Sequence, residues 1–244
     1  MKTLSAADER STRLRFRLAD QPALIARLPA SLAWLSDSER ARWEAFSTDV
    51  RRQTFLAGRW LARQTVAQWL GGAGAPGTDH WPTLTVAASG ACEVAASASV
   101  FVSISHHGTQ VACAVAAVPV GVDIEGPRKR RDVVALAGMV HGDAHQAALA
   151  QMLPQQRDAS FLQAWTLKEA WLKARQQGLD FALMRSLHFD DGTADTADTA
   201  DTAFTRHGDL FVALAAVPAL PDVIDSPPGW IWRRCRSRRS TDPA

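Results

Sequence analysis

Residues 100–125 read VFVSISHHGTQVACAVAAVPVGVDIE, and this stretch decides the fold class. Valine and isoleucine alternate with other side chains over 100–105, and a second apolar run follows at 111–118. The residues between them, 106–109, are typical of a turn, so the two runs predict neighbouring strands. After Pro119, the segment VGVDIE predicts a third strand, and the three together form a sheet meander.

The third strand carries two carboxylates. Residues two apart on a strand share a face, about 6.6 Å apart, so Asp123 and Glu125 point one way while Val122 and Ile124 point the other. Two like charges on a half-buried strand repel each other, and burial adds a desolvation cost for each ion. Two remedies are open, namely pairing with the basic loop RKRR at 128–131 or a bound divalent cation.

A long helix is predicted over 157–178, RDASFLQAWTLKEAWLKARQQG, with Gly178 at its end. At about 100° per residue, Glu169 falls within the apolar arc of this helix and faces the core. Lys173 lies one turn later, and a Glu–Lys pair at this spacing is also an ordinary helix feature worth about 0.2–0.5 kcal/mol. The chain nevertheless has only four lysines, and two of them lie in TLKEAWLK. A chain that otherwise prefers arginine keeps compact, titratable charges here.

The three acidic residues indicate a type of ligand. Asp123, Glu125 and Glu169 offer oxygen donors without cysteine or histidine, a set that suits Mg²⁺ better than Zn²⁺. Mg²⁺ usually takes its remaining ligands from water and substrate phosphates, so a phosphate-bearing ligand is expected. Ser105 and His106 stand at a strand end, where hydroxyl, imidazole and backbone N–H groups can meet phosphate oxygens. The histidine is equally well explained as a residue of a surface turn.

The rest of the chain indicates two α+β halves that meet near 118–120. Apolar spacing predicts a helix over 34–70 that begins at Ser36 or Ser38, and the loop GGAGAPG follows it. Strands around a loop are expected after residue 186, with the repeat TADTADTAD as a flexible hairpin tip. We therefore divide the chain into residues 1–118, residues 119–225 and a flexible basic tail, 226–244.

The bulk composition is that of an ordinary globular chain. It has 244 residues, a formal net charge of +2 and three cysteines without CxxC spacing, so neither a disulfide framework nor a thiolate metal site is indicated. No signal-peptide pattern and no apolar run of about 18 residues is present, and a soluble cytoplasmic protein is expected. Basic clusters at 51–63, 128–131 and 233–239 suit an acidic partner or a solvated surface.

Four segments together resemble the 4′-phosphopantetheinyl transferases of the Sfp type, in the order of that family. SDSERARWEAF…RRQTFLAGRWLAR is similar to its N-terminal helices with their GR-x-L-x-R element. FVSISHHGTQVACAV resembles its SxSH strand and turn, and GVDIE its metal-binding strand. FLQAWTLKEAWLKARQQGL resembles its W-x-x-KEA-x-x-K helix. GVDIE alone is a weak signal, but the combination covers most of the chain and is specific.

The resemblance implies an α+β fold of two similar α/β halves in a pseudo-twofold arrangement, with coenzyme A in the cleft between them. It places Mg²⁺, with Mn²⁺ as an alternative, on Asp123, Glu125 and Glu169. Coenzyme A contacts are implied for five residues: Arg42, Ser105, His106, Asp123 and Lys173. The catalytic residues implied are Glu169, which takes a proton, and Lys173, which assists the departing phosphate.

The implied reaction moves the 4′-phosphopantetheine arm of coenzyme A to a serine of an apo acyl or peptidyl carrier protein and releases adenosine 3′,5′-bisphosphate. A monomer is expected, with no membrane or nucleic-acid partner, and the loop at 128–131 would steer an acidic carrier. Two rival functions stay open. One is a Mg²⁺-dependent phosphohydrolase of coenzyme A or nucleotides, and the other is a non-catalytic module that binds carrier proteins.

Three departures from the family pattern stand out. The region ahead of the SxSH strand reads SGACEV and lacks the usual Gly-Lys/Arg-Pro, which puts one phosphate contact in doubt and leaves it open to another arginine. VHGDAHQAAL replaces an element that usually carries a glutamate, with Asp143 or His145 in its place. RQQGL has lost one glycine of the usual GxGL. The second departure would change how carriers are recognised, and the third predicts only a local change.

Overall fold

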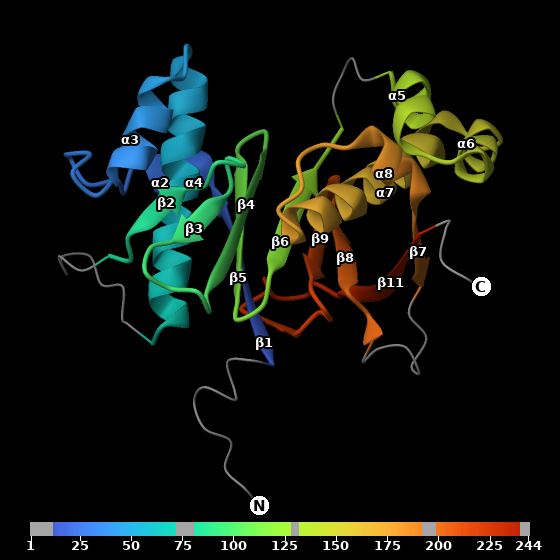
Figure 1. Ribbon diagram of the computed structural model, residues 1–244. Coiled ribbons are helices and arrows are strands. Elements are labelled where there is room, and N and C mark those ends of the chain that lie inside the picture. Colours follow the sequence, from blue (N-terminus) through green and yellow to red (C-terminus); the bar gives the residue numbers. More distant parts are fainter. Residues whose placement is uncertain (1–11, 72–80, 128–131, 192–198, 240–244) are drawn as a thin grey trace, which may run out of the picture.

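Two β-sheets organise the computed structural model, which describes residues 12–71, 81–127, 132–191 and 199–239 (Figure 1). One sheet has six strands in the order β10-β1-β5-β4-β3-β2, and the other has five in the order β6-β9-β8-β11-β7. Helices α2, α3 and α4 lie with the first sheet, and helices α5 to α8 lie with the second. The predicted α+β fold with two α/β halves is confirmed.

The first half is built around one long helix. Its strands are β1 (Arg13–Asp20), β2 (Leu84–Val86), β3 (Cys92–Val94), β4 (Phe101–His107), β5 (Gln110–Ala116) and β10 (Asp222–Ile224), and its helices are α2 (Gln21–Ile25), α3 (Asp37–Glu44) and α4 (Asp49–Trp69). Leu61 and Val66 of α4 pack against Val115 of β5 in one buried cluster. The helix expected over 34–70 is two helices, because Thr48 starts α4 anew by accepting the backbone N–H of Arg51.

In the second half one long helix packs on the sheet, and three shorter helices pack on one another and beside the long helix. Its strands are β6 (Val120–Glu125), β7 (Leu187–Asp191), β8 (Thr202–His207), β9 (Leu210–Ala216) and β11 (Arg233–Arg239), and its helices are α5 (Val133–Val140), α6 (Asp143–Ala150), α7 (Pro154–Ala174) and α8 (Phe181–Ser186). Phe161 and Leu172 of α7 share a buried cluster with Phe211 of β9. Helix α7 ends four residues before Gly178, and Gln176 beyond it has a left-handed backbone with φ of 52°.

Strand β6 is not the third strand of a meander, as the sequence had suggested. It pairs antiparallel with β9 and forms an edge of the second sheet. Its other edge faces β4, where the hydroxyls of Ser103 and Ser105 accept the backbone N–H groups of Val122 and Ile124 at 3.0 and 3.2 Å. Serine side chains thus take the place of a neighbouring strand. Because hydrophobicity along a strand does not tell which sheet it joins, the sequence could not show this.

The two sheets are joined by a shared core. Phe16 of β1 and Ala114 of β5 lie in one buried cluster with Val122 of β6 and Leu214 of β9. Each of these four side chains is fully buried. The apolar faces of the two sheets therefore stabilise each other through a buried cluster that both halves share.

The C-terminal segment is ordered structure and corrects the expected flexible tail for residues 226–239. Strand β10 pairs in parallel with β1 of the first sheet, and β11 lies between β8 and β7 of the second. Between these strands, Trp230 and Trp232 pack on Phe16, with ring centroids 5.7 and 5.3 Å apart. Three predicted features lie outside the described residues: the basic loop at 128–131, most of the TAD repeat, and residues 240–244.

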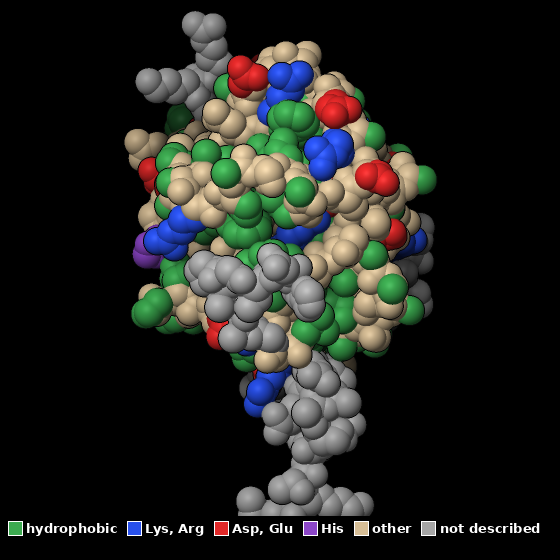
Figure 2. Space-filling view, turned by 90° about the vertical axis from the view of Figure 1, so that its left-hand side faces the viewer, with side chains coloured by type: hydrophobic (Ala, Val, Ile, Leu, Met, Phe, Trp, Pro, Cys, Tyr) green, Lys and Arg blue, Asp and Glu red, His purple; other side chains and the backbone are tan. Residues whose placement is uncertain are grey.

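The basic cluster at 51–63 does not form a basic surface. Arg59 and Arg63 are buried, which leaves Arg51 and Arg52 as its more accessible members. On the face of the first half seen in Figure 2, acidic and basic side chains are scattered among apolar and uncharged atoms. In the described part of the chain, no helix has the length and apolar content that crossing a membrane would require.

Candidate functional site

Three residues from three elements meet at one carboxylate oxygen. Asp123 on β6 is only 4% exposed, and its Oδ1 accepts a hydrogen bond from the hydroxyl of Ser105 on β4 at 2.8 Å. The same oxygen accepts a bond from Nζ of Lys173 on α7 at 2.7 Å. We call Ser105, Asp123 and Lys173 the Asp123 cluster. It joins β4 of the first half to β6 and α7 of the second.

A glycine brings α7 close enough to β6 for this contact. A Cβ at Gly121 would lie 2.0 Å from the carbonyl oxygen of Ala170 and 2.5 Å from the backbone nitrogen of Ala174. Any other residue would push the helix away from the strand. Lys173 lies in this stretch of α7, so the missing side chain at position 121 sets its distance from Asp123.

The hydroxyl of Ser105 is fully used within the protein. It donates its proton to Asp123 and accepts hydrogen bonds from the backbone N–H of Ile124 at 3.2 Å and from Lys173 at 3.3 Å. A hydroxyl has one proton and two lone pairs, so this set saturates it. In this structure Ser105 holds Asp123 in place, and its contact with a phosphate remains a prediction.

Burial and charge act against each other at Asp123. Burial raises the pKa of its carboxyl group, and the charge and hydrogen bond of Lys173 only partly offset that rise. Its second oxygen, Oδ2, is buried and has no hydrogen-bond partner among the described residues. An oxygen of this kind stays ionised more easily when a second cation is near it. The carboxylate therefore offers one unused ligand position.

The charges of three carboxylates act on the ammonium group of Lys173. Burial alone would lower the pKa of this lysine, but Asp123, Glu169 and Glu125 together raise it above the ordinary value. Lys173 is therefore fully charged at neutral pH. These three carboxylates are the ones expected to hold a metal, and each of them interacts electrostatically with Lys173. Across the described ranges, no three His, Cys, Asp or Glu side chains form a group that could hold a metal ion.

Glu125 has a partner that the sequence reasoning missed. Its Oε2 lies 3.1 Å from Nδ1 of His107, the residue after the predicted His106. Side chains alternate along β4, so Ser105 and His107 face β6, whereas His106 is on the opposite face and exposed. The same alternation could have identified His107 from the sequence. Gly126 leaves room for this pair, since a Cβ there would lie 2.9 Å from Nε2 of His107.

A cavity of about 570 Å³ lies next to the Asp123 cluster. Lys173 forms part of its wall together with Ser103 of β4 and Val120 of β6. Residues 89–94, around β3, line the other side, and Arg59 of α4 also reaches the wall. We call this space the Lys173 cavity. It takes residues from both halves and from the SGACEV segment.

The structure does not bring Arg42 to this cavity. Arg42 is exposed in the last turn of α3, and its guanidinium lies over the ring of Phe46 at 5.3 Å. Arg42 is not among the residues that line the Lys173 cavity. The arginine found in the cavity wall is Arg59.

Comparisons with known proteins point in one direction. The model of the 4′-phosphopantetheinyl transferase superfamily matches residues 119–215, which run from β6 to β9 and include Asp123, Glu169 and Lys173. The 4′-phosphopantetheinyl transferase HetI of Nostoc sp. is 29% identical over 161 residues, 66% of this chain and 66% of HetI.

Two Bacillus proteins match over a shorter stretch. The 4′-phosphopantetheinyl transferase of Bacillus subtilis is 30% identical over 33% of this chain and 35% of its own length. The 4′-phosphopantetheinyl transferase psf-1 of Bacillus pumilus is 35% identical over 33% of this chain and 34% of its own. The chain thus matches less than two thirds of the length of each of the three relatives. The matched segment contains the strand and the helix that carry Asp123 and Lys173, and over this segment the chain is similar to the 4′-phosphopantetheinyl transferase superfamily.

Proposed function

We propose that the protein transfers the 4′-phosphopantetheine arm of coenzyme A to a serine of an apo carrier protein. The observation that carries this proposal is the Asp123 cluster, whose Lys173 lines the Lys173 cavity, in a chain whose residues 119–215 match the model of this superfamily. The cluster supplies a buried carboxylate with a free ligand position and a fixed ammonium group. Phosphoryl-type transfer depends mainly on positioning the reactants and on neutralising charge. The carboxylate and the ammonium group can serve these two purposes.

Coenzyme A would bind in the Lys173 cavity. The volume of about 570 Å³ falls in the range of pockets that enclose small ligands. Lys173 and Arg59 place two positive charges on its wall, which suits a ligand with several phosphates. Arg59 thereby supplies the basic contact that the SGACEV segment lacks. Ser103 adds a hydroxyl at the same wall.

Asp123, Glu125 and Glu169 would hold a Mg²⁺ ion, and the chemistry of the donors fits this ion. The unused Oδ2 of Asp123 is a hard oxygen ligand, and the other two carboxylates already act on the same cation. When bound, the ion would offset the negative charge of the pyrophosphate and orient it. Mn²⁺ prefers similar ligands and is the alternative.

The protein's own side chains would handle the proton and the leaving group. The oxygen of the carrier's serine forms a bond to the phosphorus next to the pantetheine arm while the bond from this phosphorus to the bridging oxygen breaks. Glu169, half-buried on α7 one turn before Lys173, would take the serine proton. Adenosine 3′,5′-bisphosphate would leave with the electron pair, and the ammonium group of Lys173 would stabilise its new charge.

The partner would be an acyl or peptidyl carrier protein, and the protein would act as a monomer. The basic loop at 128–131 would steer an acidic carrier toward the site by long-range attraction. Charge reversal in this loop should then slow association at low ionic strength. Unchanged association kinetics under those conditions would exclude the steering role.

Product analysis tests the proposed transfer against hydrolysis. Coenzyme A and Mg²⁺ are incubated with the protein, with and without an apo carrier, and the nucleotide products are separated by chromatography. We expect adenosine 3′,5′-bisphosphate only when the carrier is present. Release of a nucleotide without the carrier would instead identify a phosphohydrolase, and no product in either case would leave only a binding module.

A further inference from the structure

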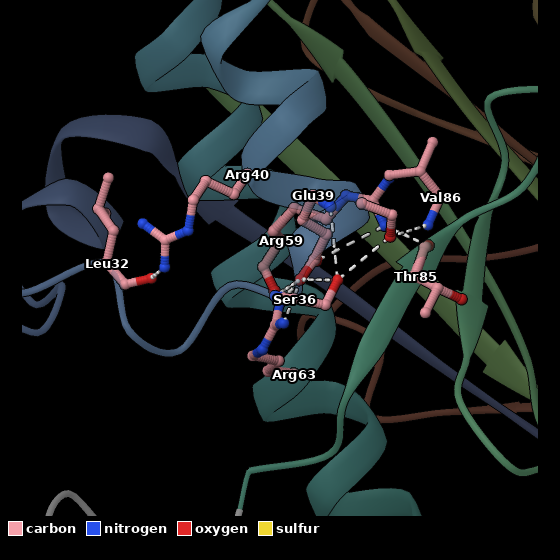
Figure 3. Close-up of polar contacts among 9 residues, drawn as sticks. Leu32, Ser36, Glu39, Arg40, Arg59, Arg63, Thr85 and Val86 are labelled. Carbon is pink, nitrogen blue, oxygen red and sulfur yellow. Dashed lines mark hydrogen bonds and ion pairs between the residues drawn. The ribbon is translucent and has the colours of Figure 1, made fainter.

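The first half contains a buried ionic cluster beside the Lys173 cavity (Figure 3). Glu39 of α3 is fully buried, and Arg59 and Arg63 of α4 are 5% and 1% exposed. Arg63 binds both carboxylate oxygens of Glu39, with Nη1 2.9 Å from Oε1 and Nη2 on Oε2. Arg59 approaches the same carboxylate less closely, with Nη1 3.8 Å from Oε1. We call these three residues the arginine cluster.

Glu39 also fixes the start of α3. Its Oε2 accepts the backbone N–H of Ser36 at 2.9 Å, which closes a capping box at the N-terminus of the helix. Close by, Ser38 accepts the backbone N–H of Val86 on β2 at 3.1 Å. Glu39 therefore connects α3 to α4 at a point where α3 is also attached to the sheet.

Arg59 is held from several sides and still reaches the cavity wall. Its Nη1 donates to the carbonyl oxygen of Thr85 on β2 at 3.1 Å. Its guanidinium lies over the ring of Phe55 at 5.0 Å. Arg63 binds both oxygens of Glu39, and Arg59 is the member of the cluster that lines the cavity. This arrangement fixes the position of one arginine with respect to the ligand space.

The arginine cluster carries an excess positive charge. Two guanidinium groups share one carboxylate, so one positive charge is not balanced within the cluster. Glu93 also lines the cavity, but it is exposed and its charge is solvated. An unbalanced buried charge is costly unless an opposite charge approaches it. An anionic group in the Lys173 cavity, next to Arg59, would supply that opposite charge.

We propose that Glu39 is a positioning residue for anion binding: its ion pair with Arg63 holds Arg59 at the wall of the Lys173 cavity, ready for a phosphate group. This inference rests on the proposed function, which makes that phosphate part of coenzyme A. Glu39 does not touch the ligand, and it acts through Arg59. Two parallel hydrogen bonds fix the orientation of the Glu39 carboxylate as well as balancing its charge. The oriented carboxylate in turn favours one position of the Arg59 guanidinium.

A charge-conserving double variant separates position from charge. Glu39→Gln/Arg63→Met deletes the ion pair but leaves the single excess charge of Arg59, and a glutamine side chain at position 39 can still close the capping box. Removing both partners of a buried pair is often close to neutral for stability, whereas removing one leaves an unpaired charge. Arg59→Met removes the proposed ligand contact itself. Arg40→Met is the matched control, because Arg40 lies next to Glu39 but binds the carbonyl of Leu32, away from the cluster (Figure 3).

Binding of coenzyme A is measured directly by calorimetry, with folding checked by circular dichroism and the thermal midpoint. We expect Kd to rise about tenfold or more in Arg59→Met and at least threefold in the double variant, while Arg40→Met binds as the parent does. If the double variant folds and binds coenzyme A with unchanged Kd, Glu39 and Arg63 are only structural and the proposal is overturned. Unchanged binding by Arg59→Met would overturn it as well.

The salt dependence of Kd keeps the test decisive if the double variant is less stable than the parent protein. Displacement of Arg59 should weaken the fall of affinity with added salt, and a purely structural loss of folded protein should not change this slope. An unchanged slope therefore counts against the proposal. If the parent protein does not bind coenzyme A at all, it is the proposed function that fails, and the two failures are thereby distinguished.

Discussion

At the scale of single residues, the site depends on how one serine hydroxyl and one carboxylate divide their hydrogen bonds. Ser105 donates to Asp123 and accepts from Ile124 and Lys173, and Oδ2 of Asp123 is left for a ligand. The alternation of β6 was enough to predict that Asp123 and Glu125 share a face. It could not show the pairing of Glu39 with Arg63, because these residues are 24 positions apart and belong to different helices.

Ser105→Ala tests the structural role of this hydroxyl. The variant leaves the buried N–H of Ile124 without its partner and removes one bond to Asp123. We expect the free energy of unfolding in urea to fall by about 1–3 kcal/mol. Were Ser105 only a contact for a phosphate, stability without ligand would be unchanged.

The burial of His141 should make the protein less stable at acidic pH. This residue is fully buried, its Nδ1 lies 3.1 Å from Nζ of Lys168, and burial, together with Lys168, His145 and His188, lowers its pKa to about 2. Its folded pKa lies below its unfolded value near 6.5, so between these values the unfolded chain binds a proton that the folded protein does not. Stability should therefore fall as the pH drops below about 6.5, by at most about 1.4 kcal/mol per pH unit for this proton.

The control for this effect is His141→Gln, which keeps a hydrogen-bond acceptor and cannot titrate. Unfolding free energies measured between about pH 7 and pH 5 should depend less on pH in this variant. His145, His188 and Lys168, whose pKa values burial also lowers, contribute to the remaining slope. An identical slope in both proteins would show that His141 does not contribute.

At the scale of secondary structure, the close crossing of α7 over β6 delivers Lys173 to Asp123. The apolar spacing of α7 predicted the helix, but it placed the end of the helix at Gly178 instead of Ala174. The residue pattern of β6 predicted the strand correctly. It was assigned to the wrong sheet, because its partner β9 lies far along the chain, at Leu210–Ala216. Local patterns thus predict elements, whereas long-range packing decides their neighbours.

Gly121→Ala should weaken this crossing. The new methyl group would overlap the backbone of α7 at Ala170 and Ala174, and backbone atoms cannot turn aside as a flexible side chain can. We expect a loss of about 1–3 kcal/mol in unfolding free energy, together with reduced coenzyme A binding as Lys173 moves. Gly178→Ala is the matched control, because a Cβ there meets nothing within 4 Å. Equal stability of the two variants would contradict the tight crossing.

At the scale of the whole molecule, the two halves are joined by a common core and by the C-terminal segment. That segment adds β10 to the first sheet and β11 to the second, and its tryptophans pack on Phe16 between them. The sequence predicted the two halves, but its basic composition near the end suggested a loose tail. Composition failed there because most arginines of β11 can stay exposed while Cys235 is buried.

The shared core predicts that the halves unfold together. Phe16 is fully buried between the sheets, so Phe16→Ala should lower the unfolding free energy by about 3–5 kcal/mol. Tryptophan fluorescence and far-ultraviolet circular dichroism should report one coincident transition in both proteins. Two separate transitions, with only one of them shifted by the substitution, would mean that the halves are independent.

The intact mass of a carrier protein tests the central claim most directly. An apo carrier domain is incubated with the protein, coenzyme A and Mg²⁺, and a carrier whose acceptor serine is replaced by alanine serves as the control. The account predicts that the first carrier gains the mass of one phosphopantetheine group and the control gains nothing, and that Glu169→Gln largely abolishes the gain. A carrier of unchanged mass beside a folded protein that binds coenzyme A would contradict it.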